Sequence, residues 1–388
     1  MNKYVFPKKS STTSLVDIQI GKPELKSVME VINSGWVTEG RKVQRFEEIF
    51  AKFIGTKYAV ATSSGTSALQ IALAELKLPK GAEIITTPFT WESTISAIIY
   101  AGAIPVFADV DPLTFNISPE SIQEKISKQT RGIVVVHYAG LPADMQSIKK
   151  IADGHGFFVI EDSAHALGSE FNFQKTGSLG DAGCFSFGST KVITTGEGGM
   201  ITTNNEKSYK KYKILKNYGE TKSSNEKRGL DKWSYDIVEL SYNFKMNEFA
   251  AAIGIEQMKR LPKIIEGRAN SLKLYQRALS GYSRIKIQMV DKRIKCVPLY
   301  FPIVLNVGSK NIREEIMLDL EKSDIETSIY YPVVYKLSIF KKLFKDNIIK
   351  CPNAERISDS IFSVPCHGKV KEEQVTKINN VLKKHLGY

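Results

Sequence analysis

The residues best suited to catalysis lie in a segment that ends a predicted strand and leads into a glycine-rich turn. Residues 180–199 read GDAGCFSFGSTKVITTGEGG, with a single lysine, Lys191. Glycine allows the backbone to approach a bulky group closely, so this segment would place the Lys191 amine at the edge of a cavity. A single lysine is otherwise most often a solvated surface charge, so neighbouring motifs decide between the two interpretations.

Two other motifs supply groups that such a lysine needs. Glu161 and Asp162 end a predicted parallel strand, where open α/β sheets bind their ligands, and strand alternation lets only one of the two face a site. Residues 62–67, TSSGTS, place hydroxyl and backbone N–H groups at a helix N-terminus, which suits a phosphate group. Taken alone, such a turn is more often a plain helix cap.

Together these groups are the set that pyridoxal phosphate chemistry requires. The aldehyde of this cofactor needs a lysine amine, its pyridine nitrogen needs an acidic partner, and its phosphate needs an anion site. An aromatic side chain stacked on the ring would complete the set, and Trp91, which follows the second predicted strand, is placed to supply it. The sequence therefore predicts a pyridoxal phosphate site.

The elements that must position these residues form an α/β pattern. Near-continuous apolar runs alternate with helix-length segments at 66–76, 90–101, 119–127 and 144–153, which predicts a mostly parallel sheet covered on both faces. Only about eleven residues separate the last two strands, fewer than a parallel crossover needs, so the last strand should run antiparallel. The predicted strands are 58–62, 83–88, 104–110, 132–137, 157–161, 182–187 and 199–203.

The rest of the chain predicts a second, smaller unit. Residues 206–236 read as a helix followed by a long loop, and residues 247–261 have the spacing of an amphipathic helix. Beyond it, a strand at 297–304 and a helix at 371–386 are expected. We therefore predict an N-terminal arm and a large cofactor-binding domain over residues 1–261, and a small C-terminal domain over residues 262–388.

Composition indicates an ordinary globular protein and excludes a disordered or fibrous one, because 42% of its 388 residues are hydrophobic and 24% are charged. The N-terminus lacks the apolar core of a secretory signal. The most apolar stretch, 95–108, is shorter than the roughly 20 residues that span a bilayer. A cytoplasmic protein without a membrane partner is therefore expected. The four cysteines and five histidines lack zinc-site spacing, so no metal site is predicted.

The formal net charge of +13 is concentrated in residues 261–388, which hold 23 Lys and Arg residues and 13 Asp and Glu residues. Such an excess either attracts an anionic ligand, such as a diphosphate or a nucleic acid, or is a lysine-rich solvated surface. No nucleic-acid-binding motif accompanies it, so no nucleic-acid partner is predicted.

Four motifs, in order and spacing, resemble the sugar aminotransferases of the DegT/StrS type, which are pyridoxal phosphate enzymes of fold type I. The motifs are YAVATSSGTSAL at 58–69, EDSAHALG at 161–168, SFGSTKVITTGEGG at 186–199 and YNFKMNE at 242–248. The likeness extends from about Gly35 to Pro365. It implies a large domain with a mostly parallel seven-stranded sheet that contains one antiparallel strand, and a smaller C-terminal α/β domain.

The resemblance also implies roles for individual residues. Lys191 matches the lysine that binds the cofactor aldehyde and later moves a proton, and Asp162 matches the residue that keeps the pyridine nitrogen protonated. The remaining cofactor-binding positions are Gly65, Thr66 and Ser186 at the phosphate, Trp91 on the ring, His165 near the phenolic oxygen, and Asn243 at the phosphate of the partner subunit. A homodimer with shared active sites is therefore expected.

The implied activity is transfer of an amino group from L-glutamate to a keto-sugar, with a UDP-, dTDP- or GDP-linked keto-deoxyhexose as the acceptor. Lipopolysaccharide, O-antigen and antibiotic sugar synthesis are the usual settings. Lys191 favours amination, because relatives that dehydrate sugars carry histidine there. Two alternatives stay open: a keto-sugar without a nucleotide, such as a keto-acid sugar or a cyclitol, and a non-catalytic regulatory protein that binds pyridoxal phosphate.

Overall fold

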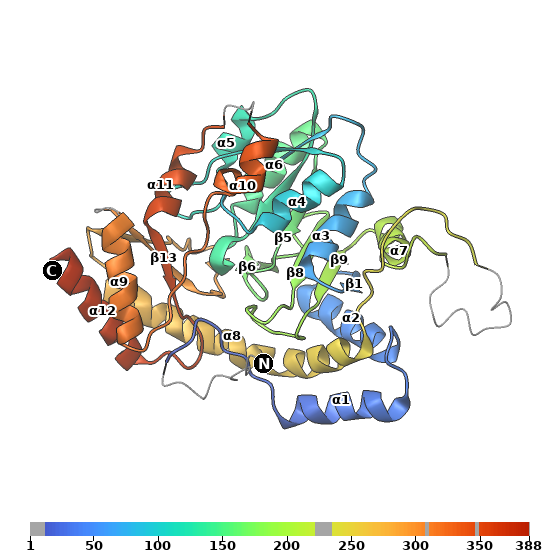
Figure 1. Ribbon diagram of the computed structural model, residues 1–388. Coiled ribbons are helices and arrows are strands. Elements are labelled where there is room, and N and C mark those ends of the chain that lie inside the picture. The colour runs from blue at the N-terminus through green and yellow to red at the C-terminus, as the bar shows by residue number, and fades with distance from the viewer. Residues whose placement is uncertain (1–11, 222–234, 307–309, 346–348, 388) are drawn as a thin grey trace, which may run out of the picture.

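A computed structural model describes residues 12–221, 235–306, 310–345 and 349–387. At its centre lies a seven-stranded sheet with the strand order β1-β9-β8-β5-β4-β2-β3 (Figure 1). All seven strands lie where the sequence predicts them, within three residues at each end. They are β1 (Tyr58–Thr62), β2 (Glu83–Thr86), β3 (Ile104–Phe107), β4 (Thr130–Val136), β5 (Phe158–Asp162), β8 (Ala182–Ser186) and β9 (Gly199–Thr203).

The direction of β9 sets it apart from the rest of the sheet. It pairs antiparallel with both β1 and β8, whereas the other neighbouring pairs are parallel. The predicted single antiparallel strand is therefore confirmed, and its cause is the short connection from β8. As a result, the C-terminal ends of β1, β5 and β8 lie at the same edge of the sheet.

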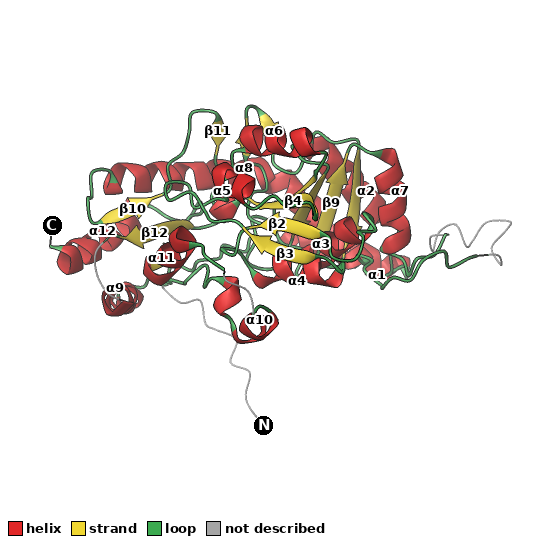
Figure 2. Ribbon diagram, turned by 90° about the horizontal axis from the view of Figure 1, so that it is seen from above, coloured by secondary structure: helices red, strands yellow, loops and turns green. Residues whose placement is uncertain are grey.

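Helices cover both faces of this sheet, as the near-continuous apolar strands predict (Figure 2). One face packs its buried apolar side chains against three helices, and the other face packs against four. Helix α1 (Lys22–Ser34) lies along α8 on the outside. The three helices on the first face are α3 (Gly65–Ala74), α4 (Glu92–Tyr100) and α7 (Glu206–Leu215). The four helices on the other face are α2 (Arg41–Ile54), α5 (Pro119–Glu124), α6 (Met145–His155) and α8 (Glu248–Leu279).

A smaller antiparallel sheet with the order β10-β12-β13 forms at the far end of α8. Its apolar side chains share a core with the C-terminal part of α8 and with two further helices. These elements are β10 (Ile285–Ile287), β12 (Phe301–Leu305), β13 (Ile361–Val364), α9 (Lys310–Lys322) and α12 (Glu372–Leu386). The remaining short elements are β6 (Glu170–Phe171), β7 (Gln174–Lys175), β11 (Ile294–Lys295), α10 (Ser338–Leu343), α11 (Pro352–Ser360) and the 3-10 helices η1 (Tyr138–Gly140) and η3 (Val334–Lys336).

Three predictions for the C-terminal part need comment. The predicted helix 371–386 is confirmed. The predicted strand 297–304 was wrong at its start, because β12 begins at Phe301 and residues 297–300 cross instead toward the cavity described below. The loop predicted after α7 lies partly at 222–234, outside the described residues.

The helix predicted to end at residue 261 continues to Leu279 and contains Pro262 in its interior. Proline removes one helical hydrogen bond, but Ile264, Arg268 and Tyr275 beyond it are buried, so tertiary packing keeps this part helical. The predicted domain boundary near residue 262 thus falls inside α8. The division into two domains stays a prediction.

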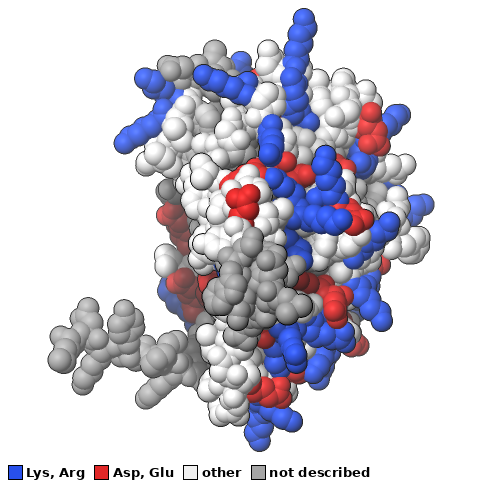
Figure 3. Space-filling view, turned by 90° about the vertical axis from the view of Figure 1, so that its right-hand side faces the viewer, with Lys and Arg blue, Asp and Glu red and all other residues white. Residues whose placement is uncertain are grey.

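Surface charges are interspersed on the face shown in Figure 3, where Lys and Arg side chains alternate with Asp and Glu side chains. In the basic C-terminal third, Asp319 lies within ion-pair distance of Lys322, Lys384 and His385, and Lys336 pairs with Glu355. These pairs favour the interpretation of a solvated surface over a single anion-binding patch. No helix of the described residues is long and apolar enough to cross a membrane.

Glu161 is fully buried on one face of the sheet, and its carboxylate accepts hydrogen bonds from the segment before β8. Because Ala143 N–H donates to Nδ1 of His137 at 3.1 Å, the ring proton lies on Nε2, which donates to Glu161 at 2.9 Å. The carboxylate also accepts, at 2.7 to 2.8 Å, the backbone N–H groups of Gly177, Leu179 and Gly180. Glu161 therefore has a structural role on the face opposite Asp162.

We expect Glu161→Gln to lower the free energy of unfolding by about 2–4 kcal/mol, because the amide would turn an N–H₂ group toward buried donors. Urea unfolding of the purified variant measures this loss. Glu48→Gln, at an exposed ion pair with Arg45, should change the unfolding free energy by no more than about 0.5 kcal/mol. Equal stability of the two variants would contradict the role given to Glu161.

Candidate active site

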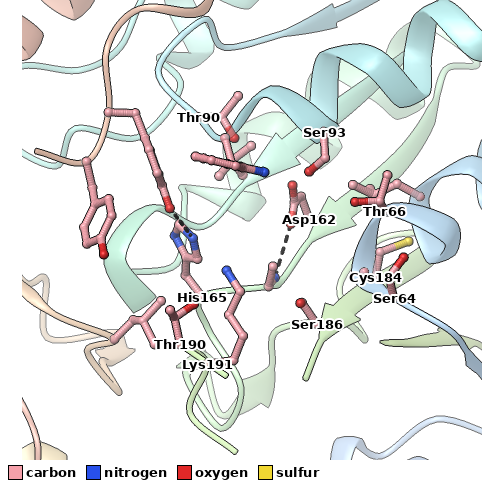
Figure 4. Close-up of a pocket in the computed structure, with 18 of the residues that line it drawn as sticks. Ser64, Thr66, Thr90, Ser93, Asp162, His165, Cys184, Ser186, Thr190 and Lys191 are labelled. Atoms are coloured by element: carbon pink, nitrogen blue, oxygen red, sulfur yellow. Dashed lines mark hydrogen bonds between the residues drawn. The ribbon is translucent and has the colours of Figure 1, made fainter. Parts of the chain in front are cut away.

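One cavity of about 410 Å³ opens at the edge of the sheet where β5 and β8 end (Figure 4). Seven of the eight site residues predicted from the sequence line it. They are Gly65, Thr66, Trp91, Asp162, His165, Ser186 and Lys191. The eighth, Asn243, is exposed and is not among the lining residues; its side-chain oxygen accepts the backbone N–H of Lys245 at 3.4 Å.

Lys191 reaches the cavity from the loop that joins β8 to β9. The loop folds back on itself through two backbone bonds, Phe187 N–H to Gly198 O at 2.8 Å and Thr195 N–H to Phe187 O at 3.0 Å. Burial lowers the pKa of the Lys191 amine to about 8, although the carboxylates of Asp162 and Glu197 act in the opposite direction. About a tenth of this amine is therefore uncharged at pH 7, far more than of a lysine with the usual pKa.

Asp162 is the last residue of β5 and is 6% exposed. Its Oδ2 accepts the hydroxyl of Thr94 at 2.7 Å, and its Oδ1 accepts the backbone N–H of Ala164 at 3.2 Å. Thr94 lies in α4, and its hydroxyl is also 3.0 Å from that of Thr90. These bonds fix the carboxylate at the cavity wall, and Figure 4 shows it across the cavity from Lys191.

The turn before α3 packs tightly against the strands that hold the cavity. Ser64 caps the helix, because its hydroxyl accepts the N–H of Ser67 at 3.0 Å, so the helix-cap interpretation of this turn is correct for Ser64. A Cβ on Gly65 would lie 2.7 Å from the Cβ of Ser186, and one on Gly199 would lie 2.2 Å from the Ser64 carbonyl oxygen. Glycine at both positions lets the N-terminus of α3 and the hydroxyl of Ser186 border the same space.

His165 is buried, and its Nε2 is 2.9 Å from the hydroxyl of Tyr331. Burial, and secondarily the charge of Lys191, lower the pKa of His165 well below its usual value, so the ring is neutral. Its Nδ1 is buried and has no hydrogen-bond partner among the described residues. In Figure 4 the ring lies beside the end of the Lys191 side chain.

Sequence reasoning missed several residues of this cavity. Leu15 and Val16 form part of the wall although they lie far from any motif. Three tyrosines from the C-terminal part also line it: Tyr300, Tyr330 and Tyr331. No local pattern could have placed these side chains. The four-residue spacing of Thr90 and Thr94, within the helix predicted at 90–101, could have suggested the partner of Asp162.

The residues of the cavity fit pyridoxal phosphate. A lysine amine and a carboxylate lie on opposite sides, and a helix N-terminus with two close-packed glycines borders a serine hydroxyl. The unpartnered Nδ1 of His165 needs a polar atom that the described protein does not provide, and the phenolic oxygen of the cofactor is such an atom. Trp91, 56% exposed at the cavity mouth, offers an aromatic face.

Comparisons with known proteins agree with this arrangement. GDP-perosamine synthase of Vibrio cholerae is 32% identical over 365 residues, which cover 93% of this chain and 96% of that protein. The solved structure of Helicobacter pylori PseC, an aminotransferase involved in the biosynthesis of pseudoaminic acid, superposes with a TM-score of 0.89 at 29% identity, covering 97% of this chain and all of that one.

A second solved structure, the putative sugar aminotransferase Spr1654 of Streptococcus pneumoniae in its pyridoxal phosphate form, gives a TM-score of 0.88 at 26% identity, covering 96% of this chain and 98% of the other. The profile of one family, described as the DegT/DnrJ/EryC1/StrS aminotransferase family, matches residues 18–383. The chain therefore belongs to the DegT/DnrJ/EryC1/StrS family of sugar aminotransferases, as its four motifs predicted.

Proposed function

We propose that this enzyme uses pyridoxal phosphate to transfer the amino group of L-glutamate to the ketone of a nucleotide-linked sugar. The observation that carries the proposal is the meeting of Lys191, Asp162 and His165 with the turn before α3 in one cavity. The family membership and the relative in its pyridoxal phosphate form support the cofactor. The relative named GDP-perosamine synthase supports a nucleotide-linked acceptor.

When bound, the cofactor supplies an electron sink for the carbon that loses a proton. Asp162 would hold the pyridine nitrogen, and Thr94 keeps that carboxylate in place through its 2.7 Å hydrogen bond. The N–H groups at the start of α3 and the hydroxyl of Ser186 would hold the phosphate, because a helix N-terminus favours anions. Trp91 would cover one face of the ring.

Lys191 would bind the cofactor aldehyde until the amine of the donor displaces it, and its freed amine would then act as the general base and acid of the reaction. An amine can accept a proton only when it is uncharged, and burial already lowers the pKa of Lys191 to about 8. In the first half of the reaction its Nζ would take the proton from Cα of the amino donor. In the second half it would return a proton to the sugar carbon that receives nitrogen.

We also propose that the active site is completed by a second copy of the chain. Asn243 lies outside its own cavity, as expected if it contacts the phosphate of the partner. Large apolar side chains are exposed around it and on α1, an arrangement typical of an interface. These residues are Leu25, Met29, Ile32, Ile237, Val238, Leu240 and Tyr242.

Adding L-glutamate to the purified enzyme should abolish the visible absorbance of its bound cofactor, and a keto-sugar should then restore it. A panel of UDP-, dTDP- and GDP-linked keto-sugars, tested against free keto-sugars and cyclitols, identifies the acceptor by mass spectrometry of the product. Turnover with free keto-sugars alone would contradict a nucleotide-linked acceptor. A spectrum that no amino donor changes would support a regulatory protein instead.

Lys191→Ala should lower turnover by about 10⁴-fold or more.

The reactivity of Lys191 should follow a pKa near 8. Half of its amine is then uncharged at pH 8, against about 0.3% for a lysine at the usual 10.5. The cofactor-free chain is acylated at a series of pH values, and mass spectrometry of the Lys191 peptide gives the extent of reaction. The pH at which the acylation rate is half of its maximum is the midpoint. Exposed Lys210, whose pKa its partner Glu206 raises, provides an internal control with a midpoint above that of an ordinary lysine.

Asp162→Asn should move the Lys191 midpoint below that of the wild type, because the Asp162 carboxylate raises the pKa of this amine. A Lys191 midpoint equal to that of Lys210 would contradict the burial argument.

Mixing two inactive variants tests the shared site. If Asn243 acts across the interface, a mixed dimer of Lys191→Ala and Asn243→Asp chains has one site with both native residues. Random exchange of subunits should then restore about a quarter of wild-type activity, since half of the dimers are mixed and one of their two sites is intact. Activity that stays at the level of the separate variants would show that Asn243 does not act in trans.

A further inference from the structure

His165 and Tyr331 form a buried hydrogen-bonded pair at the wall of the cavity. They come from segments 166 residues apart, and their rings stack with centroids 5.8 Å apart and an interplanar angle of 25°. Both side chains are almost fully buried, with exposed fractions of 4% and 6%. The only hydrogen bond described for the imidazole joins its Nε2 to the Tyr331 hydroxyl at 2.9 Å, and Nδ1 is left without a partner.

A neutral imidazole carries one proton, on one nitrogen or the other. If Nε2 carried it, the Tyr331 hydroxyl would accept this bond, and Nδ1 would be an acceptor that faces the phenolic oxygen of the cofactor, itself an acceptor when ionised. If the hydroxyl donates to Nε2, the imidazole proton lies on Nδ1, where the phenolic oxygen of the proposed cofactor can accept it. Two acceptors that face each other leave both unsatisfied, so the second arrangement is favoured when the cofactor faces Nδ1.

We propose that Tyr331 is a positioning residue: its hydroxyl fixes the proton of His165 on Nδ1, so that the imidazole donates a hydrogen bond to the phenolic oxygen of pyridoxal phosphate. This inference rests on the proposed function, which places that cofactor in the cavity. It extends that function to a residue of the C-terminal part that acts on the cofactor only through His165.

The surroundings of the pair support this arrangement. The charged groups that line the same cavity are Lys191, Asp162 and Glu197. Burial and Lys191 keep the pKa of His165 low, and burial raises the pKa of Tyr331 above its usual value. The imidazole therefore stays neutral and the phenol keeps its proton, as a donor to Nε2 must.

Tyr331 is also held firmly enough to keep its hydroxyl at Nε2 of His165. Its carbonyl oxygen accepts the hydroxyl of Ser358 at 3.0 Å, and its ring packs against Trp91, Tyr138 and Tyr330 with centroids 5.2 to 6.4 Å apart. The hydroxyl therefore cannot leave Nε2 without moving a packed aromatic cluster.

The first test reads the proton on His165 directly. In protein labelled with ¹⁵N-histidine and studied as purified, the His165 signals are identified by their loss in His165→Gln. We expect them to show the form with the proton on Nδ1 in the wild type. Tyr331→Phe, which removes only the hydroxyl, should populate the form with the proton on Nε2. Wild-type signals of the Nε2 form, or signals unchanged in Tyr331→Phe, would overturn the proposal.

The second test reads the cofactor. A donor at Nδ1 favours the ionised phenolic oxygen, so losing it should raise the pH midpoint of the visible absorbance change of the holoenzyme. We expect Tyr331→Phe to raise this midpoint by about one pH unit, the size expected for one hydrogen bond to a charged oxygen. In a His165→Gln background, Tyr331→Phe should cause no further shift, because the two side chains act as a unit.

Tyr335→Phe is the matched control, since the Tyr335 hydroxyl donates to Glu355 at 2.7 Å and does not line the cavity. Its midpoint should equal that of the wild type. A shift as large in Tyr335→Phe as in Tyr331→Phe, or no shift in Tyr331→Phe, would refute the positioning role. A wild-type protein without any visible band would instead contradict the proposed function, and the labelled histidine would still test the pair.

Discussion

The active site depends on the alternation of side chains along β5, which sends two consecutive carboxylates to opposite faces of one sheet. Glu161 is fully buried behind the sheet and accepts four N–H donors from the segments around it. Asp162 ends the strand on the side of the cavity. A slip of one residue in the register between β5 and β8 would exchange the two, and the donors around Glu161 make that slip costly.

A second constraint is electrostatic. The cavity must lower the pKa of Lys191 enough to make its amine reactive and still hold acidic groups nearby. Burial lowers this pKa and the carboxylates of Asp162 and Glu197 raise it, and burial prevails. The same burial keeps His165 neutral. One low-dielectric space thus makes the amine easier to deprotonate and keeps the imidazole neutral.

The parts of this arrangement that could be predicted from the sequence are those encoded within one strand and its following turn. The apolar runs located all seven strands, and the short link between β8 and β9 predicted the antiparallel strand. Strand ends followed by small polar residues indicated Asp162, Lys191 and the turn before α3. By contrast, the amphipathic spacing predicted a helix over residues 247–261 only, whereas burial of the turns after Pro262 keeps α8 helical to Leu279, a tertiary effect that periodicity does not report.

The tyrosine-rich wall shows why the rest could not be predicted. Tyr331 meets His165 across 166 residues, and Leu15 reaches the same cavity from the N-terminal segment, whose backbone bonds to residues 324 and 326 beside the small sheet. Such contacts depend on how the C-terminal part packs on the large sheet, not on any local pattern. The polar groups for chemistry therefore come from the sheet edge, whereas the aromatic and aliphatic wall of the cavity comes from segments distant in the chain. Changes in that wall would alter substrate choice or cofactor tuning without moving Lys191 or Asp162.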